Sequence, residues 1–210
     1  MNVLDSFLNS CRDSVRTIMR RIAAGLNHLT RGKLSPNTVT FIGLGMHLPI
    51  AWLIAQGYFG YAAIGLVVFG LFDTLDGELA RLQNKASPAG MVLDASTDRM
   101  KEVLLYCGAA YALIQQNQAT YAVWAVAACG ASLCVSYVKA KGETAVKDRN
   151  LSANQINRLF QDGLLRFEVR MFLLVVGLLI GELAIVLVII AVLSTYTALD
   201  RLAKITRALS

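Results

Sequence analysis

Charged side chains are scarce in this 210-residue sequence. Asp, Glu, Lys and Arg together account for 16% of the residues, whereas 56% are apolar. Water-soluble domains carry about 25% charged and about 45–50% apolar residues, so this composition excludes an ordinary soluble domain. A chain with this balance is expected to have lipid as its solvent.

Cysteine and proline are also rare, with four and three residues. None of the cysteines forms a C-x-x-C pair, so the sequence predicts neither a disulfide framework nor a zinc site. The net charge is +6, but no DNA-reading motif accompanies it. We therefore expect no nucleic-acid partner, and the positive charge should lie at one face of a membrane.

Long runs without charge are present instead, at residues 34–72, at 103–138 and, interrupted by Glu182 alone, at 171–199. As single helices at ~1.5 Å per residue the two longest would measure about 54–58 Å, whereas a hydrocarbon core is ~30 Å thick. Each run must therefore turn back once. Glycine or amide residues offer such turns at 56–60, 115–118 and 181–182.

These turns divide the chain into six hydrophobic segments. The sequence predicts an all-α integral membrane protein with six transmembrane helices, in a membrane domain that covers residues 31–210. The expected spans are residues 37–56, 59–82, 91–114, 119–141, 164–181 and 183–206.

The basic residues test this topology, because an even number of spans puts both termini and the two longer loops on one side. All 20 Lys and Arg residues fall on that side, and the three opposite turns contain none. They lie within residues 12–33, 81–101, 139–170 and 201–207. Lys and Arg in short loops mark the cytoplasmic face, so we predict a multi-pass protein of the cell membrane with both termini in the cytoplasm.

Residues 1–30 have an amphipathic pattern. Arginines alternate there with apolar residues at helical spacing, which are Val3, Leu4, Phe7, Leu8, Val15, Ile18, Met19, Ile22 and Leu26. The pattern predicts a juxtamembrane helix on the cytoplasmic face, attracted by anionic lipid. The alternative is an ordinary helix that packs on the transmembrane bundle.

Acidic residues lie unexpectedly close to the second and third spans. An ionised side chain inside a bilayer costs at least ~2.5–3.5 kcal/mol, so such acids normally face a cavity and have partners. Helical geometry at 100° per residue places Asp73 and Asp76 on one narrow face and Asp94 and Asp98 on another. If the two helices are antiparallel neighbours, the four carboxylates meet around one point.

Four carboxylates share a buried site only if cations neutralise them or if some stay protonated. Oxygen donors without His or Cys suit Mg²⁺, Mn²⁺ or Ca²⁺. Two divalent ions would balance the four charges and could clamp a displacement at phosphorus. Gly77, Ala80 and Gly90 beside the acids leave room for a bulky substrate or for close helix packing, and Arg81 could hold a phosphate oxygen.

The joint spacing of these residues is more specific than any one of them. From Asp73 the chain reads D-T-L-D-G-E-L-A-R, then eight residues to Gly90, and then Asp94 and Asp98 at intervals of four. This stretch resembles in full the signature D-x2-D-G-x2-A-R-x8-G-x3-D-x3-D of the CDP-alcohol phosphotransferase family, also called class I CDP-alcohol phosphatidyltransferases. The resemblance covers about residues 31–207.

The resemblance implies six membrane helices, a homodimer, and transfer of a phosphoalcohol group from a CDP-linked donor to an acceptor hydroxyl with release of CMP. It implies that Asp73, Asp76 and Asp94 bind two Mg²⁺ ions, with Mn²⁺ as a possible substitute. Asp98 would bind one ion and act as the general base. The residues expected near CDP are Asn37, Thr40, Gly77, Ala80 and Arg81.

Two further stretches are similar to the phosphatidylinositol-phosphate synthases of this family. They are L-D-A-S-T-D-R at residues 93–99 and S-Y-V-K-A at residues 136–140. Basic residues on the cytoplasmic side would then bind the phosphate of the acceptor, namely Lys139, Arg166, Arg170, Arg201 and Lys204. The positive-inside rule alone also explains basic residues at that face.

The interpretation is a phospholipid-synthesis enzyme that transfers phosphatidyl from CDP-diacylglycerol, or an ether analogue, to a phosphorylated polyol, with inositol 1-phosphate preferred. A phosphatidylglycerophosphate synthase that uses glycerol 3-phosphate is the alternative within the family. A small ion- or proton-coupled transporter is the alternative from another class. Against it, the acids gather at one face and the opposite halves of the spans are apolar.

Overall fold

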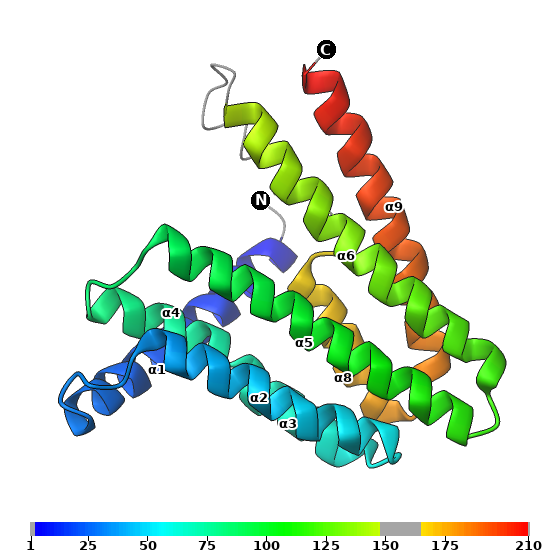
Figure 1. Ribbon diagram of the computed structural model, residues 1–210, viewed down its shortest axis with the longest axis horizontal. Helices are drawn as coiled ribbons and strands as arrows, with labels where there is room; N and C mark the ends of the chain where they lie inside the picture. Colours follow the sequence, from blue (N-terminus) through cyan, green and yellow to red (C-terminus); the bar gives the residue numbers. More distant parts are fainter. Residues whose placement is uncertain (1–2, 148–164, 210) are drawn as a thin grey trace. The chain divides into compact units, whose positions relative to one another are not determined.

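The computed structural model describes residues 3–147 and 165–209, and helices with short connections make up this part of the chain, with no strand in it (Figure 1). The all-α prediction is confirmed for these residues. The helices are α1 (Val3–Leu29), α2 (Pro36–Ala55), α3 (Phe59–Gly70), α4 (Phe72–Leu82), α5 (Pro88–Gln115), α6 (Ala119–Lys147), α8 (Phe167–Ile180) and α9 (Leu183–Leu209).

The helix boundaries follow the predicted turns. Gly57, Asn117 and Gly181 have φ values of 78°, 58° and 76°. This left-handed conformation ends a helix and reverses the chain, and glycine adopts it without the steric cost of a Cβ. The second predicted span is two helices, α3 and α4, which meet at Leu71. Residue 164, where the fifth span was expected to begin, lies outside the described residues.

Four segments of the described chain are long and apolar enough to cross a membrane: Pro36–Ala55, Phe59–Leu82, Ala119–Ala145 and Leu183–Leu209. The other two expected spans do not meet that standard. α5 carries charged side chains from Asp94 to Glu102, and α8 has only 14 residues, about 21 Å of helix at 1.5 Å per residue. Length and composition therefore support four of the six predicted spans.

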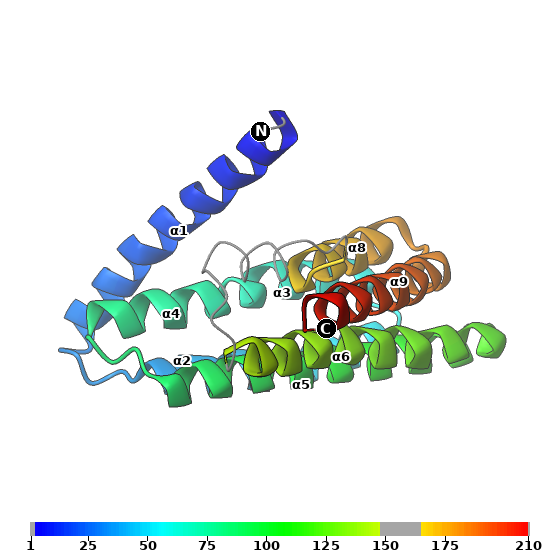
Figure 2. The ribbon, with the colours of Figure 1, turned by 90° about the horizontal axis from the view of Figure 1, so that it is seen from above.

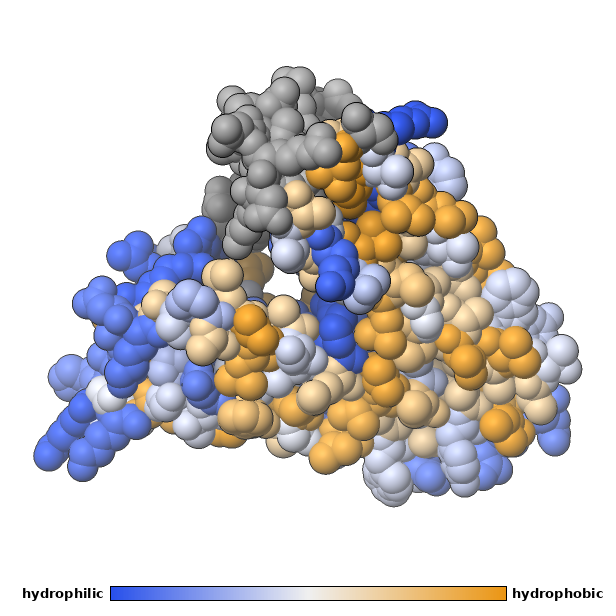
Figure 3. All heavy atoms as spheres, turned by 45° about the horizontal axis from the view of Figure 1, so that its top comes forward, coloured by the Kyte–Doolittle hydropathy of each residue, from blue (hydrophilic) through white to orange (hydrophobic). Residues whose placement is uncertain are grey.

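Large apolar side chains are exposed over much of the described surface, as the orange areas of Figure 3 illustrate. Tyr61, Val126 and Phe172 are 70%, 69% and 65% exposed. Soluble monomers rarely expose large contiguous apolar patches. The surface is therefore that expected of helices surrounded by lipid.

The chain forms two compact units. The first contains residues up to Ile50 together with Ile64–Lys101. In it, α1 packs against α4 (Figure 2). The apolar core of this unit contains Met19 and Ala23 from α1, Leu75 and Leu79 from α4, and Val39 from α2.

α1 has a second apolar face that nothing in the described chain covers. Val15, Ile18 and Ile22 are 36%, 53% and 42% exposed, whereas Met19 and Ala23 pack on α4. One face of α1 thus packs on α4, and another is exposed. The position of this helix on the cytoplasmic face of a membrane stays a prediction. Side chains 3–14 lie outside the described ones.

The second unit contains Ala51–Ala63 and the chain from Glu102 onward. Here α6 runs beside α9, which also contacts α8 (Figure 1). Gly177 permits the contact between α8 and α9, since a Cβ at this position would lie 2.7 Å from Val186 Cγ2. Cys107, Cys129 and Cys134 are free thiols.

Candidate functional site

Three of the four predicted carboxylates meet within the first unit. Asp73 and Asp76 lie on α4, Asp94 lies on α5, and one oxygen from each is within 4.8 Å of the other two. The i,i+3 spacing puts the two α4 residues on one face of their helix. The predicted meeting of the two acidic faces is confirmed for these three side chains.

The connection between α4 and α5 brings these faces together. After α4, Asn84 adopts φ 53°, and the Lys85 amide donates to the Ala80 carbonyl at 2.8 Å, which closes the helix end. α5 then begins at Pro88, and the Ser87 hydroxyl accepts a 3.1 Å hydrogen bond from the Gly90 amide. A serine cap followed by proline is a strong helix start, so the loop 83–87 sets where α5 begins and which face carries Asp94.

Thr40 on α2 forms a hydrogen bond with one member of the carboxylate cluster. Its hydroxyl donates a 2.5 Å hydrogen bond to Asp76 Oδ2, and both side chains are buried. The sequence placed Thr40 and Asn37 near the nucleotide. The structure places the Thr40 hydroxyl on a predicted metal ligand, whereas Asn37 is exposed.

Asp98, the fourth carboxylate, is held by cationic side chains. Lys101 Nζ donates to Asp98 Oδ1 at 3.2 Å and also to Asp73 Oδ1. Arg99 Nη2 lies 3.8 Å from Asp98 Oδ2. Lys101 is 1% exposed, so its ammonium group is buried beside these carboxylates.

The three-carboxylate cluster fits a divalent cation. Its donors are all oxygens, which suit Mg²⁺ or Mn²⁺. Asp94 Oδ1 is buried and accepts no hydrogen bond within the described part of the chain. A buried carboxylate oxygen without a donor is costly, and a bound cation would satisfy it.

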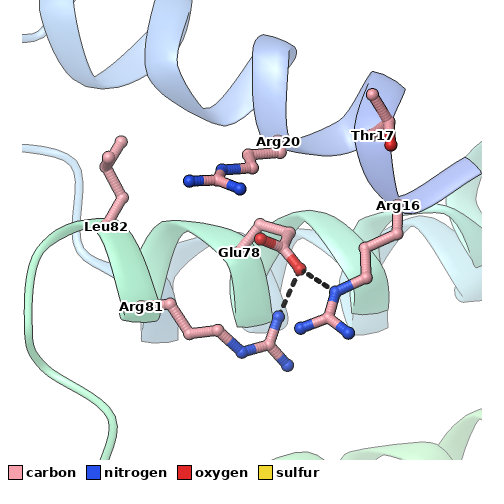
Figure 4. Close-up of a pocket in the computed structure, with 6 residues that line it drawn as sticks. All are labelled: Arg16, Thr17, Arg20, Glu78, Arg81 and Leu82. Atoms are coloured by element: carbon pink, nitrogen blue, oxygen red, sulfur yellow. Dashed lines mark hydrogen bonds and ion pairs between the residues drawn. The ribbon is translucent and has the colours of Figure 1, made fainter. Parts of the chain in front are cut away.

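A basic pocket of about 590 Å³ lies between α1 and α4 (Figure 4). Glu78 Oε1 accepts from Arg16 Nε at 2.7 Å and also from Arg81 Nη1. Three arginines against one glutamate leave a net charge of +2 on its lining. The lining residues are Arg16, Thr17, Arg20, Glu78, Arg81 and Leu82.

Gly77 borders open space on the side of Arg81. A Cβ on this residue would have only Arg81 Nη2 nearby, at 3.9 Å. Protein packing therefore does not require a glycine at this position. Space for a ligand would explain the absence of a side chain here. Ala80, one turn further, is partly buried.

Arg170, predicted to bind the acceptor phosphate, has a protein partner instead. Its guanidinium is 1% exposed and donates to both oxygens of Glu102, at 2.8 and 3.0 Å, and to the Leu165 carbonyl at 2.9 Å. A buried arginine needs such a carboxylate to offset its desolvation. The donors expected to hold a phosphate are thus engaged inside the second unit.

The other predicted acceptor residues also belong to the second unit. Arg201 is buried, and Arg166 and Arg170 lie close enough to act on it electrostatically. Lys139 and Lys204 lie on exposed helix surfaces, where their Nζ atoms are 3.8 Å from Glu143 and 2.7 Å from Asp200. The structure therefore brings the three arginines together, while each of the two lysines has an acidic neighbour on its own helix.

Residues 33–198 match the family model described as CDP-alcohol phosphatidyltransferase. The chain belongs to the CDP-alcohol phosphatidyltransferase family. The resemblance drawn from the signature is thus confirmed, and the acid cluster lies where the family signature predicts it.

Sequence relatives point to one branch of the family. A phosphatidylinositol phosphate synthase of Corynebacterium glutamicum is 34% identical over 54% of this chain and 53% of its own length. A bifunctional IPC transferase and DIPP synthase of Rubrobacter xylanophilus is 30% identical over 83% of this chain and 38% of its own length. The chain thus spans about half the length, or less, of these two relatives.

Solved structures match this chain over most of its length and most of their own. The phosphatidylinositol phosphate synthase of Mycobacterium tuberculosis with CDP-DAG bound is 25% identical, with a TM-score of 0.77 over 90% of this chain and 94% of that one. The same enzyme in complex with manganese and citrate has a TM-score of 0.76 over 90% and 88%. The fold of this family member, an all-helical membrane protein, is therefore that of these enzymes.

Sequence reasoning missed four residues of this site. Lys101 lies three residues after Asp98, on the same helical face, and this spacing could have revealed it. Arg16, Arg20 and Glu78 form the basic pocket with Arg81. Their role depends on the packing of α1 on α4, which no local pattern reveals.

Proposed function

We propose that this chain is a phospholipid-synthesis enzyme that transfers phosphatidyl from CDP-diacylglycerol to inositol 1-phosphate and releases CMP. The observation that carries the proposal is the cluster of Asp73, Asp76 and Asp94 within the family signature. The names of the sequence relatives and of the structural neighbour support the donor and the acceptor.

In this proposal Asp73, Asp76 and Asp94 hold a divalent metal ion. A bound divalent ion would stabilise the negative charge of the donor diphosphate and of the departing CMP. Asp98 accepts the proton of the acceptor hydroxyl, because a hydroxyl is a poor nucleophile until a base removes its proton. Thr40 fixes the orientation of Asp76 through its hydrogen bond.

The donor would lie beside α4. Gly77 leaves space there, Ala80 adds little bulk, and Arg81 offers guanidinium donors that suit phosphate oxygens. Arg16, which binds the same Glu78 oxygen as Arg81, and Arg20 add positive charge to this pocket (Figure 4). Asn37 is exposed on α2 and would contact the nucleotide from that helix.

For the acceptor phosphate we retain Arg166, Arg201, Lys139 and Lys204. Arg170 would support these residues structurally, since its bidentate ion pair with Glu102 holds it in place. Glycerol 3-phosphate would use the same cations, so a phosphatidylglycerophosphate synthase is the closest competing activity. The donor chains, acyl or ether, would lie in the membrane.

The physiological ion in this proposal is Mg²⁺, with Mn²⁺ as a substitute. The manganese complex of the Mycobacterium tuberculosis enzyme supports the use of a divalent ion in this fold. The family resemblance implied two ions in each site. Asp73, Asp76, Asp94 and Asp98 together carry enough negative charge to balance two divalent ions.

We also propose the remaining features of the membrane arrangement. The chain crosses the cytoplasmic membrane six times with both termini in the cytoplasm, and α1 lies on the cytoplasmic surface with Val15, Ile18 and Ile22 in lipid. The membrane domain begins near residue 31. As in the family, the working form would be a homodimer.

The test is release of CMP from radiolabelled CDP-diacylglycerol by purified protein with Mg²⁺. We expect release to depend on added inositol 1-phosphate. Asp98→Asn should lower the rate about 10²- to 10⁴-fold, the usual contribution of a general base. Glu182→Gln, which changes an exposed acid in the turn between α8 and α9, is the control and should keep the rate.

A panel of acceptors separates the competing activities. Inositol 1-phosphate, glycerol 3-phosphate, serine and free inositol would be compared at equal concentration. Turnover with glycerol 3-phosphate alone would replace the proposed acceptor, and turnover only with unphosphorylated acceptors would refute the basic site. Transport of ions or protons into vesicles that contain the protein, without release of CMP, would favour the transporter.

A further inference from the structure

Glu78 lies between two arginines of the basic pocket. It is 6% exposed, and its Oε1 atom accepts a 2.7 Å hydrogen bond from Arg16 Nε on α1 and another from Arg81 Nη1 on α4 (Figure 4). The side chains of both arginines are 55% exposed. One buried carboxylate oxygen thus holds two exposed guanidinium groups that come from two helices.

The bond to Glu78 orients the rest of the Arg81 guanidinium. Its Nη2 atom lies 3.9 Å from the place that a Cβ on Gly77 would occupy, and Gly77 directly follows Asp76 of the carboxylate cluster. A planar guanidinium binds phosphate oxygens well only when its edge faces them. Glu78 therefore holds Arg81 with donors toward the space that the proposed function gives to the donor.

An exposed arginine gains from being held in this way. Its long side chain loses rotamer entropy when a ligand immobilises it. An ion pair that already restricts the side chain removes part of this cost before the ligand binds. Glu78 can restrict Arg81 because its own carboxylate is buried, and Arg16 on the same oxygen restricts that carboxylate further.

The charge of Glu78 acts in the opposite direction. A negative charge beside Arg81 weakens the attraction of the pocket for an anionic diphosphate. This repulsion is reduced, because two positive groups surround the carboxylate and the pocket is open to water and salt. The positioning effect and the charge effect of Glu78 thus predict opposite changes in donor affinity when its charge is removed.

We propose that Glu78 and Arg16 are positioning residues of the donor site, which hold Arg81 toward the phosphates of CDP-diacylglycerol. α1 thereby contributes to donor binding through Arg16. Glu78 occupies an unspecified position of the family signature, and Arg16 lies outside it. This inference rests on the proposed function and adds two residues to its donor site.

The sign of one substitution tests the proposal. CDP, the soluble head group of the donor, would be titrated into purified protein in detergent with Mg²⁺, and its Kd measured by calorimetry. We expect Glu78→Gln to weaken CDP binding roughly 10-fold, as loss of a hydrogen bond to a charged group does. Unaltered or stronger binding would overturn the positioning role. Glu182→Gln, the control used above, should leave the Kd unaltered.

A mutant cycle tests whether Glu78 acts through Arg81. Arg81→Lys keeps the positive charge and removes the planar fork. In that background Glu78→Gln should not weaken CDP binding further, because the group that it positions is gone. Further weakening of the same size would show a general structural role and would overturn the proposal.

A second cycle tests the part played by α1. Arg16→Met should weaken CDP binding, and its effect should be smaller when Glu78 is already Gln. Equal effects in the two backgrounds would mean that Arg16 acts only through its charge, and its positioning role would fall.

The same titrations separate this inference from the proposed function. If Glu78→Gln does not fold, Glu78→Asp replaces it, since it keeps the charge and shortens the side chain. Weaker CDP binding in Glu78→Asp supports the positioning role, and unaltered binding overturns it. Either result leaves the transferase in place, whereas no saturable CDP binding by the unchanged protein would remove the donor site and both proposals.

Discussion

Single residues around the acid cluster determine how firmly it can hold a cation. Thr40 donates its hydroxyl proton to Asp76 and so fixes the rotamer of that carboxylate. Partners of metal-binding side chains typically contribute 10–100-fold to metal affinity. We predict that Thr40→Val, which keeps the shape and removes the donor, weakens Mn²⁺ binding about 10–100-fold in a dialysis titration.

Two variants on the same helix serve as controls. Thr40→Ser keeps the donor and should keep most of the affinity. Thr38→Val changes an exposed threonine two residues away and should leave Mn²⁺ binding unaltered. Equal affinity in Thr40→Val and the unchanged protein would mean that the hydrogen bond does not orient Asp76.

The buried ion pair of Glu102 and Arg170 is a second residue-scale feature. Removing one partner of a buried pair leaves the other charge uncompensated, at a cost of about 3–5 kcal/mol. Glu102→Gln should lower the free energy of unfolding by about that much, measured by chemical denaturation in detergent. Asp200→Asn breaks a half-exposed pair with Lys204 and should cost about 0.3–0.5 kcal/mol. Equal losses in the two variants would contradict this account.

The carboxylate cluster and Arg170 differ in how far the sequence could predict them. Asp73, Asp76 and Asp94 were predictable because their spacing fixes a helical face. Arg170 was not, because its partner is 68 residues away in sequence and the positive-inside pattern does not distinguish a buried arginine from a phosphate ligand. Partners that are far apart in the sequence can be identified only once the fold is known.

At the scale of helices, the close approach of α2 and α5 depends on Gly108. A Cβ at this position would overlap the carbonyl oxygen of Ala51 and lie 3.1 Å from its carbonyl carbon. Both atoms belong to a backbone, so a helix must shift. Overpacking of this kind costs typically about 1–3 kcal/mol, more than the ~0.5–1 kcal/mol that alanine gains over glycine inside a helix.

Gly108→Ala should therefore destabilise the protein, whereas Gly130→Ala should not. Gly130 has nothing within 4 Å of an added Cβ, so only the favourable helix term remains there. Denaturation of the two variants in detergent compares them directly. Opposite signs are expected, and a stabilised Gly108→Ala protein would show that α2 and α5 are not packed this closely.

Helix ends were easier to predict than helix contacts. The reversals after α2, α5 and α8 contain glycine or amide residues that accept a left-handed conformation. The interruption between α3 and α4 at Leu71 has no such residue, and Leu71 itself keeps helical dihedrals of −74° and −16°. An apolar residue in a helical conformation gives no signal in the sequence, so one span was predicted where two helices meet.

At the scale of the whole molecule, the charges on α5 bear on its predicted crossing of the bilayer. Its first half carries the acids of the candidate site, Arg99 and Lys101, while its second half, to Gln115, is apolar. Most of the charges there compensate one another, since Lys101 pairs with Asp73 and Asp98, and Glu102 pairs with Arg170. Paired charges that face the bundle interior are tolerated in membrane helices, so we expect α5 to span.

Labelling of single cysteines tests this crossing. In a variant whose native cysteines are replaced by alanine, Lys85→Cys would report on the loop before α5, and Gln116→Cys on the turn after it. Both positions are exposed. In intact bacterial cells a membrane-impermeant thiol reagent should label position 116 and should reach position 85 only after the membrane is permeabilised, because basic loops stay in the cytoplasm.

A second pair of positions gives the control. Gln56→Cys, in the turn after α2, should label in the same way as position 116, and Lys33→Cys, before α2, in the same way as position 85. Labelling of positions 85 and 116 from the same side, with positions 33 and 56 on opposite sides, would mean that α5 does not cross. The acid cluster would then belong to a helix lying at the membrane surface, where water and not a bound cation could compensate Asp94 and Asp98.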